Sequence, residues 1–413
     1  MTDIRRPAAH RALALAFGIV LLAGAAAPCT LAVISGKAAR NGRPLMWKNR
    51  DTSALDNKLM ALRGPKYAFT AVVDAADAAG DEVWGGLNTA GFAIMNSQSD
   101  DLIDPALKGD GAANGAFMRR ALGECATVRD FEALLARTKG TLDLAANFGV
   151  IDAEGQACFF ETSRHGWQKF DAADPRVAPF GTLVRTNFAF TSPDPLKGGG
   201  FIRFERISHL VEAARGAGRL DARFILQEAS RDLVHEKLHS YPLSRPLPED
   251  PAEPLYINTN DTINRNSSAS AMVFEGAPSP ERADLATMWV VLGQPVAGVA
   301  VPVWPFAGAV PGPTAGAPTA PLCDLARAAV AYLYPDRRGR MPQYLSLTRL
   351  RTYGGEGWPA KRQRIEDAVL ERTAAELAKW EKARPTVAQV AAFQESVASA
   401  AYEAWKADLA GIR

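Results

Sequence analysis

The sequence lacks several features that mark common classes of protein. Its 413 residues include four cysteines and five histidines, and 47 Lys and Arg residues stand against 45 Asp and Glu residues. Charges of both signs are interspersed, which excludes the basic patch expected of a nucleic-acid-binding protein. Four cysteines are too few for a disulfide scaffold. There is no Gly-x-Ser-x-Gly elbow of a serine hydrolase, and no apolar run after residue 27 is long enough to span a membrane.

The first residues are predicted to form an export signal. Arg5 and Arg6 make a basic start, Ala12–Leu22 is apolar, and Ala25 and Ala27 are the small residues that a signal peptidase needs. We assign 1–28 to a signal peptide or propeptide, and we expect a periplasmic or secreted protein whose mature form has no stable membrane span. A permanent N-terminal anchor is the alternative.

Cys29 is the most informative residue because removal of the leader would make it the first residue of the chain. It would then carry both a thiol nucleophile and an α-amine, whose pKa near 8 suits it to act as a general base at neutral pH. Pro28 lies between the expected cleavage and Cys29, and proline is a poor residue beside a scissile bond. We therefore expect Cys29 to attack the carbonyl of Pro28 itself. An envelope lipoprotein anchored through Cys29 is the alternative, although Pro28 disfavours lipidation.

The pattern of elements predicts an α+β fold, because strands and helices occur in blocks rather than in alternation. Strands are expected at Cys29–Ser35, Pro44–Lys48, Tyr67–Val73, Glu82–Leu87, Phe92–Ser97, Phe148–Asp152, Ala157–Glu161, Gly166–Phe170, Ser270–Phe274 and Met288–Leu292. Helices are expected after Thr127, where Asp130 completes a capping pattern, and at Ile202–Ala214, Arg223–Leu238, Cys323–Leu333, Ala360–Trp380 and Val387–Leu409. The Asn41-Gly42 pair predicts a hairpin between the first two strands. We divide the chain into a main domain at 29–305, a Pro/Ala/Gly-rich linker at 306–322 and a helical extension at 323–413.

Several polar residues at strand ends could surround Cys29. Three charged residues lie at the end of the second strand of the hairpin: Lys48, Arg50 and Asp51. An aspartate there can orient the α-amine, and a cation favours the thiolate. Asn96 and Asn187 each end an apolar strand and could donate to an oxyanion, although turns are the commoner place for asparagine. Arg265 precedes another strand and could point toward the same pocket; a plain polar loop is an equal interpretation.

Several motifs occur in an order that resembles a known family. They are Cys29-Thr30, Lys48-Asn49-x-Asp51, Gly86-Leu-Asn-x-x-Gly91, Asn96-Ser97, Gly149-Val-Ile-Asp152, Thr186-Asn187 and Arg265. Over roughly residues 29 to 305 the chain is similar to N-terminal-nucleophile hydrolases of the choloylglycine hydrolase, penicillin V acylase and isopenicillin N acyltransferase-like group. The resemblance implies a four-layer αββα fold and autocatalytic exposure of the cysteine. It also implies cleavage of a non-peptide C–N amide in a small N-acyl substrate, with no cofactor and no metal.

The resemblance further assigns roles to individual residues. Cys29 is implied to be nucleophile and base, and Asp51 to orient its amine. Asn187 and Asn96 are implied to form the oxyanion hole, and Arg265 to support the site. The family usually has arginine at the position of Lys48, and here Arg50 follows two residues later, so both remain candidates for the site cation. Hydrolysis is favoured for an exported enzyme, and acyl transfer from the same acyl-enzyme is the alternative.

A different enzyme class is suggested by His235-Glu236-Lys237-Leu238-His239, which fits the H-E-x-x-H pattern of zinc peptidases on a helix. Lys237 and Pro242 both argue against it, and a polar helix face is the preferred interpretation. The acyl group and the amine of the substrate, the oligomeric state and the pairing of Cys125, Cys158 and Cys323 remain open. Four aromatic residues could line an apolar acyl pocket, although each could equally belong to the core: Trp47, Phe92, Phe188 and Phe190.

Overall fold

The computed structural model of the protein describes residues 28–104, 113–244, 246–248, 253–316, 319–335 and 342–411. The predicted export signal therefore lies outside the described residues, apart from Pro28. Among the helices that the structure describes, none is long and apolar enough to cross a membrane.

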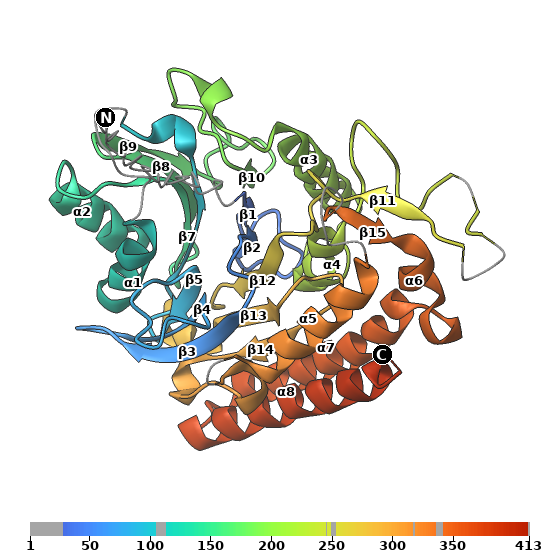
Figure 1. The fold of residues 1–413 in the computed structure, drawn as a ribbon. Helices are drawn as coiled ribbons and strands as arrows, with labels where there is room; N and C mark the ends of the chain where they lie inside the picture. Colours follow the sequence, from blue (N-terminus) through green and yellow to red (C-terminus); the bar gives the residue numbers. More distant parts are fainter. Residues whose placement is uncertain are drawn as a thin grey trace, which may run out of the picture.

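Two antiparallel sheets face one another in the centre of the molecule (Figure 1). The six-stranded sheet has the order β10 (Thr182–Arg185), β1 (Thr30–Ile34), β2 (Leu45–Asp51), β12 (Ser268–Glu275), β13 (Thr287–Leu292) and β14 (Val301–Val303). The seven-stranded sheet has the order β3 (Asn57–Arg63), β4 (Ala68–Asp74), β5 (Gly85–Asn88), β6 (Ala93–Gln98), β7 (Ala145–Ile151), β8 (Ala157–Ser163) and β9 (Gly166–Asp171). Strands β1 and β2 lie against β7, which brings the predicted Cys29 strand into the interior.

The predicted hairpin is present, because β1 and β2 pair antiparallel with Thr30 opposite Asn49. Its connection is the loop 35–44 rather than a two-residue turn. Gly42 lies in that loop at φ +74°, a conformation that costs little without a Cβ. In the hairpin the last residues of β2 lie beside the first residues of β1, so Asp51 and Cys29 lie at the same end of these two strands.

Two helices, α1 (Asn114–Glu124) and α2 (Val128–Thr138), cover the outer face of the seven-stranded sheet. The predicted helix start is confirmed: Thr127 accepts a hydrogen bond from the backbone of Asp130, and the Asp130 side chain accepts one in return. Phe131 of α2 packs its ring edge against Phe160 of β8, with ring centroids 5.1 Å apart. This layer is therefore held to the sheet by an aromatic core.

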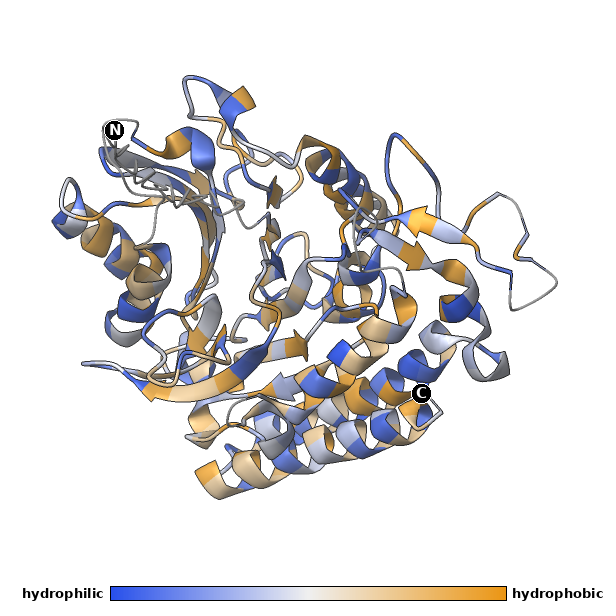
Figure 2. Ribbon diagram, viewed as in Figure 1, coloured by the Kyte–Doolittle hydropathy of each residue, from blue (hydrophilic) through white to orange (hydrophobic). Residues whose placement is uncertain are grey.

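The remaining helices lie on the side of the six-stranded sheet (Figure 1). They are α3 (Phe201–Gly216), α4 (Ala222–Gln227), α5 (Pro321–Leu333), α6 (Leu347–Thr352), α7 (Trp358–Lys382) and α8 (Val387–Leu409), with the short ladder of β11 (Tyr256–Asn258) and β15 (Tyr344–Ser346) beside them. Hydrophilic and hydrophobic residues alternate along α7 and α8 (Figure 2), as expected for helices with one solvated face. The structure is thus α+β, as the sequence predicts.

The predicted helix at Arg223–Leu238 is wrong beyond its first turns. Helix α4 ends at Gln227, a 3-10 turn follows at Ala229–Arg231, and no helix is assigned from there to Leu238. The side chain of Arg231 reaches the buried Glu366 of α7, and Asp232 pairs with Arg206 of α3. These tertiary contacts replace the helical continuation that the periodicity indicates.

The Pro/Ala/Gly-rich segment and the C-terminal helices pack on the main body of the protein. Within the segment, Ala307, Pro313 and Thr314 are buried. Helix α8 lies against β14, and its Trp405 belongs to the same apolar cluster as the residues of β1. The described part of the segment is therefore packed against the fold. The division into a linker at 306–322 and a helical extension at 323–413 stays a prediction.

Glu366 is expected to be essential for stability. It is 1% exposed, pairs with Arg231 and accepts a hydrogen bond from the backbone N–H of Ala300 at 2.8 Å. Glu366→Ala would leave the Arg231 guanidinium buried without its carboxylate, which costs about 3 kcal/mol of unfolding free energy. Urea denaturation measures this loss. The matched control is Arg364→Ala on the same helix, which breaks an exposed pair with Glu356 and should leave the midpoint unchanged. Equal midpoints for both variants would contradict the expectation.

Candidate active site

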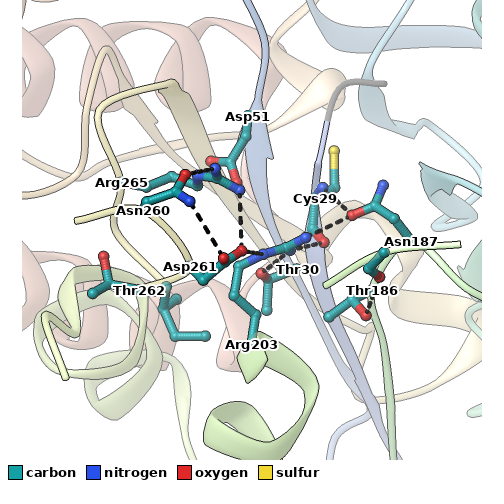
Figure 3. Close-up of polar contacts among 12 residues, drawn as sticks. Cys29, Thr30, Asp51, Thr186, Asn187, Arg203, Asn260, Asp261, Thr262 and Arg265 are labelled. Carbon is teal, nitrogen blue, oxygen red and sulfur yellow. Dashed lines mark hydrogen bonds and ion pairs between the residues drawn. The ribbon is translucent and has the colours of Figure 1, made fainter. Parts of the chain in front are cut away.

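Cys29 lies immediately before β1, at the end of the six-stranded sheet where β1 begins, and is 4% exposed. Its backbone N–H donates a hydrogen bond of 2.8 Å to Oδ1 of Asn187 (Figure 3). Asn187 follows β10, which pairs antiparallel with β1, and this pairing places it opposite the beginning of β1. Two residues that are 158 positions apart in the chain thus meet because their strands are neighbours in the sheet.

Arg203 is the cation that contacts the Cys29 residue, and the sequence interpretation missed it. One of its terminal nitrogens donates to the carbonyl oxygen of Cys29 and, at 2.9 Å, to Oγ1 of Thr30. The other donates at 2.9 Å to Oδ1 of Asn187. Arg203 is 1% exposed, and burial lowers the pKa of its guanidinium. Because arginine on an amphipathic helix usually faces solvent, nothing in the α3 pattern distinguishes Arg203 from its exposed neighbours.

Asp51 is fully buried and is the last residue of β2, at the same end of the sheet as Cys29. Its Oδ1 accepts a hydrogen bond of 2.6 Å from Oγ of Ser268. The other oxygen, Oδ2, is buried without a hydrogen-bond partner among the residues that the structure describes. Burial raises the pKa of this carboxyl to about 6, against the opposing charges of Arg265 and Arg203. A buried acceptor is therefore left unsatisfied next to the predicted nucleophile.

Arg265 lies in this cluster, on the side of Asp51. It donates to Oδ1 of Asn260 at 2.7 Å, and its guanidinium lies 3.9 Å from the carboxylate of Asp261. Asp261 lies equally 3.9 Å from Nε of Arg203, so it bridges the two arginines (Figure 3). Asp261 has φ +61°, the one positive φ outside glycine in the described residues. Such a conformation costs energy and is held here by the charges on both sides.

Lys48 and Arg50 point toward the seven-stranded sheet, on the opposite face of β2 from Asp51. Nζ of Lys48 donates to Oδ1 of Asn96 at 2.9 Å, and Arg50 pairs with Asp74 at 2.8 Å. The Arg50 guanidinium also stacks on the Trp84 ring at 4.5 Å. Alternation along a strand explains this separation of neighbouring residues. Burial lowers the pKa of both cations, and a negative charge at Cys29 would oppose this shift.

The sequence interpretation also missed Asn147, which holds the loop that carries Asn187. Asn147 lies on β7, and its Nδ2 donates to the carbonyl oxygens of Thr186 and Phe188 at 3.2 and 3.1 Å. These two carbonyls flank Asn187, whose own Nδ2 donates to the carbonyl oxygen of Gln98 at 2.8 Å. The seven-stranded sheet therefore fixes the side chain of Asn187 from β6 and β7.

The zinc-peptidase alternative is wrong in its structural premise. His235 and His239 lie in a turn and are joined by an antiparallel bridge, so they do not share a helix face. Glu236, the would-be general base, pairs with Arg206 and His209 of α3. The geometry that the H-E-x-x-H pattern requires, two histidines one helical turn apart, is absent from this described segment.

The four aromatic residues considered for an acyl pocket divide into two groups. Trp47 and Phe92 are fully buried and belong to the core. Phe188 and Phe190 directly follow Asn187 and contact one another with ring centroids 5.5 Å apart. Phe190 is 53% exposed and Phe188 only 6%, so of this pair Phe190 alone reaches the surface.

Comparison with known proteins gives a limited result. No family model and no curated protein sequence matches the chain. Among solved structures, a variant of conjugated bile acid hydrolase from Clostridium perfringens is 10% identical, with a TM-score of 0.40 over 67% of this chain and 92% of that chain. Penicillin V acylase from Agrobacterium tumefaciens is 14% identical, with a TM-score of 0.40 over 67% of this chain and 86% of that chain.

These are enzymes of the group that the sequence resembles. Identities of 10 and 14% and a TM-score of 0.40 are too low to transfer an activity or a substrate to this chain. Conclusions about its chemistry therefore depend on the contacts around Cys29.

An activity that depends on the Asp51 carboxylate is expected to fall as the pH decreases below about 6, because Asp51 then gains a proton. Its pKa in the folded chain is raised from 3.8 to about 6 by burial. The carboxylate that can hold an α-ammonium group is present above this value and is lost below it. An α-ammonium at Cys29 would add a positive charge and move the midpoint below 6. The pH profile of kcat/KM measures this acid limb; its persistence in Asp51→Asn would exclude Asp51 as the titrating group.

Proposed function

We propose that this protein is an exported N-terminal-nucleophile cysteine hydrolase that cleaves the amide bond of a small N-acyl compound. Cys29 is the nucleophile and its α-amine the general base, within a four-layer αββα fold. The observation that carries the proposal is the 2.8 Å hydrogen bond from the Cys29 backbone nitrogen to Asn187, inside a buried cluster of charged groups. A nitrogen held by a side chain at this position suits a group that must later move protons.

Exposure of Cys29 is the first step of the proposal. The Cys29 thiolate attacks the carbonyl carbon of Pro28, the peptide C–N bond breaks, and the chain upstream is held as a thioester. Water then hydrolyses the thioester and releases the upstream peptide as a carboxylic acid. The amide nitrogen of Cys29 becomes an α-amine with additional N–H groups. Oδ2 of the buried Asp51 is near this end of the sheet and has no hydrogen-bond partner within the described part of the chain. This unsatisfied acceptor supports the proposal, since an α-ammonium would neutralise it.

Substrate hydrolysis would use the same groups. The thiol proton passes to the α-amine while sulfur attacks the amide carbonyl, and the resulting oxyanion accepts hydrogen bonds from Asn96 and Asn187. The α-ammonium protonates the departing nitrogen, so the C–N bond breaks and an acyl-thioester remains. Water, deprotonated by the α-amine, releases the carboxylic acid and restores the thiol. Arg203 supports this geometry because its guanidinium donates hydrogen bonds both to the carbonyl oxygen of Cys29 and to Oδ1 of Asn187.

The test is intact mass and N-terminal sequencing of the exported protein, followed by incubation with N-acyl amides such as conjugated bile salts, penicillin V and acyl homoserine lactones. We expect a chain that begins at Cys29 and releases a carboxylic acid and an amine from one of these compounds. Transfer of the acyl group to an added amine, without free acid, would identify an acyltransferase instead. A fully active protein that retains Pro28, or carries lipid on Cys29, would refute the proposed mechanism.

A further inference from the structure

A buried lysine and a buried asparagine meet between the two sheets, near Cys29. Lys48 belongs to β2 and Asn96 to β6, and Nζ donates to Oδ1 at 2.9 Å. The two residues are 1% and 4% exposed. An ammonium group is a donor only, so this contact fixes the oxygen side of the amide toward Lys48. The amide nitrogen Nδ2 therefore faces away from the ammonium group of Lys48.

The position of the ammonium group is itself fixed by a second contact. Nζ of Lys48 also donates at 2.8 Å to the carbonyl oxygen of Trp84, whose ring stacks on Arg50. Four ionisable groups are close enough to affect the pKa of Lys48 through their charges: Cys29, Arg50, Asp51 and Asp74. Lys48 is thus a rigid charged support rather than a mobile surface side chain.

Asn96 lies on the face of β6 that is turned toward the six-stranded sheet, because its side chain accepts a hydrogen bond from Lys48 of β2. Residues two apart on a strand share a face, so Asn96 and Gln98 lie on the same side of β6. The carbonyl of Gln98 accepts the amide of Asn187, and Asn187 binds the nitrogen of Cys29. Asn96 therefore lies two residues along β6 from the carbonyl that holds Asn187, and its side chain meets Lys48.

We propose that Lys48 is a positioning residue: by holding Oδ1 of Asn96, it presents Nδ2 to the oxyanion that forms when Cys29 attacks a carbonyl. This inference rests on the proposed hydrolase function and goes beyond it, since it assigns Lys48 a role through Asn96 rather than on the substrate. A lysine in this position also responds to pH. Burial lowers the pKa of Lys48 to about 8, although a negative Cys29 opposes the shift. Above that pH the amine is neutral and binds Oδ1 less strongly, so activity should decline.

The experiment is a double-mutant cycle with Lys48→Met, Asn96→Ala and the combined variant, assayed with an amide that the wild type hydrolyses. We expect each single variant to lower kcat by about 10²-fold, as removal of one oxyanion donor does, with little change in KM. The combined variant should be no slower than Asn96→Ala, because Lys48 acts through that residue. Lys58→Met is the matched control: Lys58 is a buried lysine whose Nζ donates to the carbonyl of Ala75, and kcat should stay unchanged.

A second variant separates positioning from folding. Lys48→Arg keeps a cation that does not titrate below pH 12. We expect it to retain at least about a tenth of the wild-type kcat while the decline in activity above pH 8 disappears. Additive losses in the cycle, or an unchanged alkaline limb in Lys48→Arg, would overturn the inference and leave the hydrolase proposal intact. A wild type that begins at Cys29 but hydrolyses no amide would instead overturn the proposed function, and the inference with it.

Discussion

Replacement of Cys29 by alanine is expected to lower amide hydrolysis by at least about 10⁴-fold, because no other group can take the place of the attacking sulfur. The same change should leave Pro28 attached, since the processing step uses the same thiolate. Intact mass and progress curves of the purified variant measure both effects. Loss of the two together would indicate that a single residue cuts the chain and the substrate.

Cys125→Ala is the matched control for this variant. Cys125 is buried behind the seven-stranded sheet, and burial raises the pKa of its thiol to about 12, so it carries almost no thiolate at neutral pH. Its substitution should leave kcat per folded molecule and the N-terminus unchanged. A Cys29→Ala protein that still hydrolysed amides at the wild-type rate would disprove the role of the thiol, whatever its N-terminus.

Replacement of Asn187 by alanine is expected to lower kcat by about 10³-fold, the upper range for loss of one oxyanion donor. The variant would lose the acceptor for the Cys29 nitrogen and for Arg203, and it would also lose N–H groups near the reacting carbonyl. Steady-state kinetics should show the loss mainly in kcat, because the interaction strengthens in the transition state.

The control for Asn187 is Asn88→Ala, which also removes a buried asparagine. Asn88 binds the carbonyls of Leu122 and Cys125 and the N–H of Phe92, away from Cys29. This change should reduce thermal stability without reducing kcat per folded molecule. An Asn187→Ala enzyme with a weakened KM and an unchanged kcat would show that Asn187 binds substrate rather than the transition state.

Local features of the sequence predicted the elements that surround Cys29. The apolar strand after Cys29 and the strand predicted at Pro44–Lys48 both appear in the β1–β2 pair, with Asn41-Gly42 in the connecting loop and β2 continuing to Asp51. The Thr127 and Asp130 capping box was readable because both partners lie within four residues. Asn187 directly follows the region of the short strand β10, as the local apolar pattern predicts, whereas β6 continues past Asn96 to Gln98.

Structural features that depend on residues far away in the chain could not be predicted from the sequence. Strands β3 and β14 are short or carry charged residues, and only their pairing with neighbours makes them strands. The periodicity at Arg223–Leu238 indicated a longer helix than α4, because Glu366 and Arg206 could not be anticipated as partners for that segment. Arg203 was missed because its contacts lie more than 170 residues upstream, at Cys29 and Thr30.

The sequence by itself determined that a cysteine directly precedes a buried strand, and that acids, amides and cations lie at or near the ends of neighbouring strands; the leader before Cys29 stays a prediction. It determined these things because hydrophobic periodicity and turn chemistry act over a few residues. Only the tertiary structure decided which of those groups meet. It joined Asn187 and Arg203 to Cys29, turned Asp51 to one face of β2 and Lys48 to the other, and removed the two histidines from any common helix face. The physical reason is that most buried polar groups need a hydrogen-bond partner, and the identity of that partner depends on strand order and packing rather than on neighbouring residues.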